Sequence, residues 1–138
     1  MGAPLMAVVI DASVAVAWFV PSQASNYADR IASRTRHEAL VVPSLWEAEF
    51  ANVMTVLLRR RVLARHQVAS VLAKAERLNL VIDRDVAAAR ALFALAEQHG
   101  ISAYDATYLE LAQRRGLPLA TRDANLARAG RAAGVLLG

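Results

Sequence analysis

The chain contains no cysteine and only one lysine, Lys74, among its 138 residues. Without cysteine it can form no disulfide, no thiolate zinc site and no catalytic thiol, and this composition fits a reducing compartment. The three histidines, His37, His66 and His99, do not have the spacing of a zinc motif. Metal and thiol chemistry that depends on cysteine or clustered histidine is therefore excluded.

Long apolar runs are also missing. The longest apolar segment, Leu5 to Val20, is interrupted by Asp11 and is shorter than the ~20 residues that cross a bilayer. It lacks both the basic leader and the small-residue cleavage site of a signal peptide, so we expect a cytoplasmic protein that does not enter a membrane. A hydrophobic content of 57% against 20% charged residues excludes a disordered chain. The length fits a single domain over residues 1–138.

The charge balance is basic, with 16 lysine and arginine residues against 12 acidic ones, and all but one of the 16 are arginine. The planar guanidinium suits phosphate recognition, which indicates a nucleic-acid partner. Small arginine-rich proteins of unrelated function share this composition, so charge alone leaves the partner open.

Short apolar runs alternate with longer segments of helical periodicity. Strands are predicted at Ala7–Ile10, Leu40–Val42, Leu80–Ile82, Leu117–Ala120 and Val135–Leu137. Helices are predicted at 13–19, 27–36, 44–61, 65–78, 102–115 and 124–133, with a further apolar face formed by Val86, Leu92, Phe93 and Ala96. Buried strands separated by helices predict an α/β fold, a three-layer α/β/α sandwich with a parallel sheet of about five strands.

Several acidic residues fall at the carboxyl ends of these strands, the edge at which parallel α/β sheets bind ligands. Asp11 directly follows the first strand, Asp123 lies three residues beyond Ala120, and Glu47, Glu49 and Asp105 lie near the starts of helices. Any one of them could simply cap a helix. Together they would repel, by about 4 kcal/mol for two carboxylates ~4 Å apart, and several such pairs favour a hard divalent cation among them.

Glu47 and Glu49 compete for one role, because residues two apart on a helix point in directions about 200° apart. Glu47 suits capping, whereas Glu49 lies beyond the first turn and shares a face with Asn52 and Val53, so we select Glu49. We expect the remaining acidic residues to be solvated: Asp29, Glu38, Glu76, Asp83, Asp85, Glu97 and Glu110.

Four motifs in order, VVIDASVAVAWF, VVPSLWEAEFANVM, ISAYDATYLELA and LPLATRDANL, resemble PIN-domain ribonucleases of the VapC toxin type. The resemblance places the family's acidic metal ligands and catalytic residues at Asp11, Glu49, Asp105 and Asp123. It assigns supporting polar roles to Ser13, Asn52 and Thr121. Asn125 stands where many relatives carry a further aspartate, and we give it a supporting role too.

The resemblance implies an RNA endonuclease that uses one or two Mg²⁺ or Mn²⁺ ions to activate water and is held inactive by a cognate antitoxin. The high hydrophobic content suggests that other chains cover apolar surface; we expect a homodimer, with Trp46 and Phe50 as candidate antitoxin contacts. The alternative is a PIN-like module that binds RNA or protein without cutting. Phosphotransfer through an aspartyl intermediate is disfavoured, because Asp-Ala-Ser replaces Asp-x-Asp and Lys74 lies within a predicted helix.

Overall fold

A four-stranded parallel sheet forms the centre of the molecule in the computed structural model, which describes residues 7–138. Its strands are β1 (Ala7–Ile10), β2 (Ala39–Pro43), β3 (Leu80–Asp83) and β4 (Leu119–Ala120), in the order β3-β2-β1-β4. β1 is paired on both sides, with Val8 opposite Leu40 and Ile10 opposite Ala120. Because β1 is buried on both faces, its sequence is a continuous apolar run rather than an alternating one.

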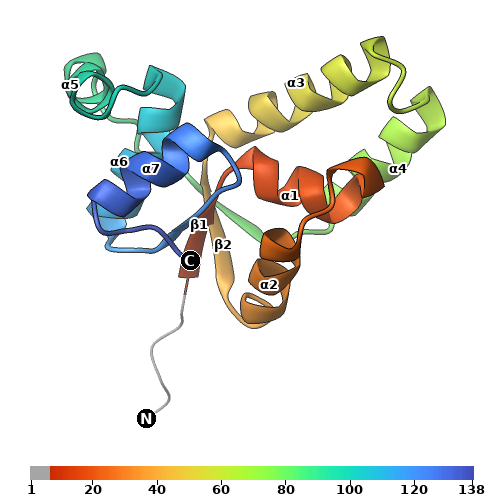
Figure 1. Ribbon diagram of the computed structural model, residues 1–138, viewed down its shortest axis with the longest axis horizontal. Helices are drawn as coiled ribbons and strands as arrows, with labels where there is room; N and C mark the ends of the chain where they lie inside the picture. Colours follow the sequence, from red (N-terminus) through yellow and green to blue (C-terminus); the bar gives the residue numbers. More distant parts are fainter. Residues whose placement is uncertain (1–6) are drawn as a thin grey trace.

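Helices cover both faces of the sheet, which confirms the three-layer α/β/α fold. Figure 1 shows α1–α4 on one side and α5–α7 on the other. The helices are α1 (Ala12–Phe19), α2 (Asn26–Arg34), α3 (Leu45–Arg59), α4 (Arg65–Glu76), α5 (Ala89–His99), α6 (Ala103–Arg115) and α7 (Ala124–Ala132), with a short 3₁₀ turn, η1 (Pro21–Gln23), after α1.

The prediction of a fifth strand at Val135–Leu137 is wrong. Leu136 makes only an isolated parallel bridge to Leu119, held by a bond from the Leu119 N–H to the Val135 carbonyl and one from the Leu137 N–H to the Leu119 carbonyl, both 2.8 Å. β4 is two residues long, so it offers too little backbone for a longer ladder.

The core contains two aromatic residues that the sequence suggested as antitoxin contacts. Trp46 and Phe50 on α3 are 1% and 3% exposed, and their rings stack with centroids 5.0 Å apart. This expectation is therefore wrong, since both rings belong to the buried hydrophobic core. Burying a large apolar side chain contributes about 1.5–3 kcal/mol, and no side chain so enclosed is available to a partner.

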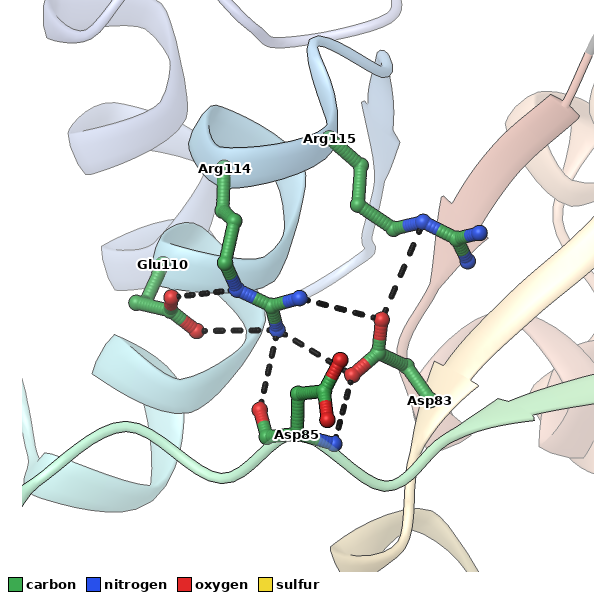
Figure 2. Close-up of polar contacts among 5 residues, drawn as sticks. All are labelled: Asp83, Asp85, Glu110, Arg114 and Arg115. Atoms are coloured by element: carbon green, nitrogen blue, oxygen red, sulfur yellow. Dashed lines mark hydrogen bonds and ion pairs between the residues drawn. The ribbon is translucent and has the colours of Figure 1, made fainter.

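An ionic network joins the end of β3 to α6 (Figure 2). The Arg114 guanidinium contacts both Asp83 carboxylate oxygens at 3.1 Å, and its Nε lies 2.7 Å from Glu110. Arg114 also donates to the Asp85 carbonyl, and Arg115 lies 3.7 Å from Asp83. The Asp83 side chain is only 7% exposed, so its prediction as a solvated residue is wrong. The neighbouring arginines hold its pKa below the ordinary value.

α5 lies at the outside of the molecule. It has no buried residue, although it carries the predicted apolar face, and Phe93 is 65% exposed. Val86 precedes the helix and is also exposed. Periodicity identified apolar side chains on one helix but not whether another element covers them. Within residues 7–138, no helix is long and apolar enough to span a membrane.

Candidate metal centre

Asp11 is the most enclosed acidic residue of the candidate site. It follows β1 directly and caps α1. One oxygen, Oδ1, accepts from the Ser13 N–H at 3.1 Å and the Ser13 hydroxyl at 2.6 Å, and Oδ2 accepts from the Thr121 hydroxyl at 2.5 Å. Its exposed fraction is 6%. These donors fix the carboxylate at the carboxyl end of the central strand.

The β4–α7 loop is bound to the same residues. The Ser13 hydroxyl accepts from the Arg122 N–H at 2.9 Å, and the Thr121 hydroxyl accepts from the Asp123 N–H at 3.0 Å. Asp123 in turn caps α7, accepting from the Leu126 N–H at 2.9 Å. The two polar residues that flank Asp11 therefore place Asp123 beside it.

Glu49 and Asp105 line a second part of the site, an open hollow of about 510 Å³ that also contains Asn52. Asp105 lies in the first turn of α6, where Ser102 rather than Asp105 caps the helix. Glu49 is half-buried, and its Oε1 has no hydrogen-bond partner within residues 7–138. Helix capping accounts for Asp11 and Asp123, but it does not explain the positions of Glu49 and Asp105.

The four carboxylates lie within electrostatic reach of one another. Burial, opposed by hydrogen bonds from Ser13 and Thr121 and increased by repulsion from Asp123, raises the pKa of Asp11 to about 6. Burial, with repulsion from Asp11 and Asp105, raises the pKa of Glu49 to about 7. Burial and Asp123 also raise the pKa of Asp105. Such shifts mark an arrangement that favours either protons or a cation.

The chemistry of this donor set fits a hard divalent cation, because every ligand is a carboxylate and one buried oxygen is unpaired. Within residues 7–138, however, no three acidic or histidine side chains stand close enough to hold a metal in their present rotamers. Asp11 and Asp123 direct oxygens to helix N–H groups instead.

Of the other polar residues predicted for the site, three lie near its carboxylates. Ser13 and Thr121 contact Asp11, and Asn52 shares the hollow with Glu49. Asn125 is exposed, as is Glu47, the residue not selected on α3.

Sequence reasoning missed two tyrosines. Tyr108 is fully buried on α6, and this burial, with the charges of Glu49 and Asp11, raises its pKa; its position three residues after Asp105, on the same helix face, was a usable signal. Burial raises the pKa of Tyr27, and the charge of Asp11 adds to this effect. No local pattern places the start of α2 near Asp11, so Tyr27 could not be found from sequence.

Known proteins share both the sequence pattern and the fold. A family profile described as the PIN domain matches residues 8–132. The chain belongs to the PIN-domain family. Ribonuclease VapC3 from Pyrobaculum aerophilum is 32% identical over 124 residues, which cover 88% of this chain and 93% of that protein.

Two solved structures share the PIN fold at low sequence identity. PAE2754 from Pyrobaculum aerophilum superposes with a TM-score of 0.62 at 20% identity, covering 93% of this chain and 87% of its own. VapC20 from Mycobacterium tuberculosis, described as a toxin that cleaves the sarcin-ricin loop, gives a TM-score of 0.59 at 14% identity, covering 94% and 96%. These likenesses support the sheet order and layering of the present PIN domain.

Proposed function

We propose that this PIN domain is a metal-dependent RNA endonuclease and the toxin of a toxin–antitoxin pair. The observation that carries the proposal is the gathering of Asp11, Glu49, Asp105 and Asp123 at one sheet edge, with three of their pKa values raised. The identity to Ribonuclease VapC3 along most of both chains supports RNA as the substrate class. We further propose that residues 1–138 act as one domain.

Asp11 and Asp105 would be the central ligands of one or two Mg²⁺ or Mn²⁺ ions, with Glu49 and Asp123 adding ligands or orienting water. When bound, such ions activate water and stabilise charge on a phosphodiester. The chain's own contribution is positioning: Ser13 and Thr121 hold the Asp11 carboxylate with three donors. Asn52 offers an amide to the hollow that contains Glu49 and Asp105.

The direct test is cleavage of RNA by purified protein freed of any partner. We expect total cellular RNA to be cut with Mg²⁺ or Mn²⁺ and left intact with EDTA, and mapping of the new ends would identify the target. RNA that stays intact with both metals, while still bound by the protein, would favour the non-catalytic RNA-binding module.

We propose a homodimer that uses exposed apolar side chains on and near α5: Phe93 on the helix, Val86 before it and Tyr104 at the start of α6 are 65%, 71% and 67% exposed, and Val86 and Tyr104 line one hollow. Exposed apolar side chains grouped in this way are typical of interfaces. Phe93→Glu should convert a dimer to a monomer in light scattering, whereas Val62→Glu, at an exposed valine after α3, should not. A wild-type monomer at micromolar concentration would refute this surface.

The proposed protein partner is an antitoxin. We propose that this chain and the antitoxin act in the cytoplasm, where RNA is accessible. Expression of the chain alone should arrest growth, and co-expression of the small protein encoded beside it should restore growth and co-purify. Harmless expression of an RNA-cutting protein would contradict the toxin role but not the nuclease.

A further inference from the structure

A second pocket of about 440 Å³ lies beside Asp11, between α2 and α7. Arg30, Arg122 and Arg131 line it, together with Tyr27, Thr121 and the last residue, Gly138; of the described residues, no aspartate or glutamate side chain lines it. We call it the arginine pocket. Pockets of about 300–1,000 Å³ enclose small ligands, and three guanidinium groups around one hollow favour an anion.

The three arginines of this pocket are available to a ligand. Within residues 7–138, none of them forms an ion pair with an acidic side chain; the ion pairs found there use Arg114 and Arg115. Arg122 is held by a 2.7 Å bond from its guanidinium to the Gln23 carbonyl, which directs its charge without neutralising it. The Arg30 guanidinium lies 5.8 Å from the centroid of the Tyr27 ring, a favourable cation–π distance.

Two short connections join the arginine pocket to the carboxylates. Thr121 lines the pocket and donates to Asp11 Oδ2. The Arg122 N–H donates to the same Ser13 hydroxyl that contacts Asp11. A polymer held with one phosphodiester at the carboxylates must place its adjoining backbone over neighbouring surface, and this pocket is basic where the site itself is acidic.

We propose that the arginine pocket binds a phosphate of the RNA strand adjacent to the bond that is cut. The inference rests on the proposed function for its substrate class. Arginine forks match phosphate oxygens in a bidentate manner, and an aromatic ring beside them suits single-stranded RNA. By holding one phosphate, Arg30 and Arg131 would fix which bond of the strand lies over Asp11.

The test compares Arg30→Gln/Arg131→Gln with a matched control, Arg34→Gln/Arg128→Gln, which also removes one exposed arginine from α2 and one from α7 but outside the pocket. The probe is a single-stranded RNA oligonucleotide cut by the wild type, with binding measured by fluorescence anisotropy in EDTA. We expect the pocket variant to bind at least about ten-fold more weakly and the magnitude of its salt slope to fall by about 0.7, the contribution of one phosphate contact on a single strand. The control should bind as wild type.

A second measurement locates the phosphate. Single phosphates flanking the cut bond are replaced in turn by neutral methylphosphonates. One replacement should weaken binding to wild type and to the control, and should have no further effect on the pocket variant. Equal sensitivity of wild type and pocket variant at every position would overturn the proposal.

The outcomes separate this inference from the nuclease proposal. If wild type cuts RNA with Mg²⁺ but the pocket variant binds RNA normally, the inference fails and the nuclease stands. If the variant loses binding of an acidic partner protein and keeps RNA affinity, the pocket is a protein interface and the inference is also wrong. If no protein cuts RNA, the nuclease proposal fails and so does a phosphate site adjacent to a cut bond; a loss of RNA affinity confined to the pocket variant would then identify the pocket as an RNA-binding surface of a non-catalytic module.

Discussion

The Thr121 hydroxyl donates a 2.5 Å hydrogen bond to Asp11 Oδ2, joining residues 110 positions apart at the ends of the neighbouring strands β1 and β4. Thr121 is 4% exposed and also accepts from the Asp123 N–H. One buried hydroxyl thus orients one carboxylate and the backbone that carries another.

Thr121→Val should shift the pH dependence of cleavage. The Thr121 hydroxyl stabilises the ionised form of Asp11 and so lowers its pKa; without that donor the pKa of Asp11 rises further. We expect the acid limb of the pH–rate profile to move to higher pH with a well-preserved far-ultraviolet circular dichroism spectrum. Thr55→Val, at an exposed threonine on α3, is the control, and an unshifted acid limb in Thr121→Val would contradict this role.

The two glutamates of α3 should respond differently to neutralisation. Glu49→Gln removes a half-buried charge coupled to Asp11 and Asp105, whereas Glu47→Gln changes an exposed one. We expect Glu49→Gln, like Asp11→Asn and Asp105→Asn, to lower kcat by at least about 100-fold, in the range seen when electrostatic groups are removed from active sites. Glu47→Gln should retain activity within about three-fold of wild type, because an exposed charge is screened by solvent and salt. Comparable losses of kcat in Glu49→Gln and Glu47→Gln would contradict the assignment of Glu49 alone to the site.

The metal-free protein should become more stable as the pH falls from 8 to 5. In the fold, the pKa values of Asp11 and Glu49 are about 6 and 7, above the ordinary values of about 3.9 and 4.3 expected in the unfolded chain. The folded state therefore binds more protons in this window, and protonation favours it. The pKa of Asp83 is instead lowered in the fold, so its ionised form stabilises the folded state. This stabilisation is lost only as the pH falls below about 4.

Urea unfolding in EDTA measures this effect. We expect the buried Asp11 alone to contribute about 1 kcal/mol to the rise in unfolding free energy between pH 8 and pH 5, and Asp11→Asn to show a smaller rise. Excess Mg²⁺ should stabilise the wild type at pH 8, by about 2.7 kcal/mol at 100 times its Kd, and much less at pH 5, because protonated carboxylates bind it poorly. Stability that falls steadily from pH 8 to 5 in EDTA would show that these carboxylates are not buried together.

The Asp83–Arg114 pair should matter for stability more than for chemistry. Arg114→Gln leaves the nearly buried Asp83 carboxylate with the 3.7 Å contact to Arg115 and the 3.0 Å bond from the Asp85 N–H, and we expect a loss of about 1–2 kcal/mol in unfolding free energy. Asp83→Asn combined with Arg114→Gln should recover part of that loss, since no buried charge then lacks its partner. Arg128→Gln, on an exposed part of α7, should leave thermal unfolding unchanged.

The sequence predicted what depends on local pattern. The apolar run before Asp11 predicted β1, and the change to helical periodicity after Pro43 predicted α3. The selection of Glu49 over Glu47 for the site stays a prediction. What depends on remote contacts was not predictable. The burial of Asp83 requires an arginine 31 residues away, the exposure of Phe93 depends on what packs against α5, and the failed strand at 135–137 reflects the shortness of its neighbour β4.

The candidate site draws two carboxylates from each helix layer: Asp11 and Glu49 from α1 and α3, and Asp105 and Asp123 from α6 and α7. The candidate ligands therefore come from both helix layers, and any movement of one layer relative to the other changes the distances between these ligands. A displacement of about 1 Å can cost a hundred-fold in rate yet leave a core intact. The rate of RNA cleavage should therefore respond to small displacements between the two helix layers that a thermal unfolding curve does not detect. As the temperature rises, cleavage activity should be lost before the fold unfolds.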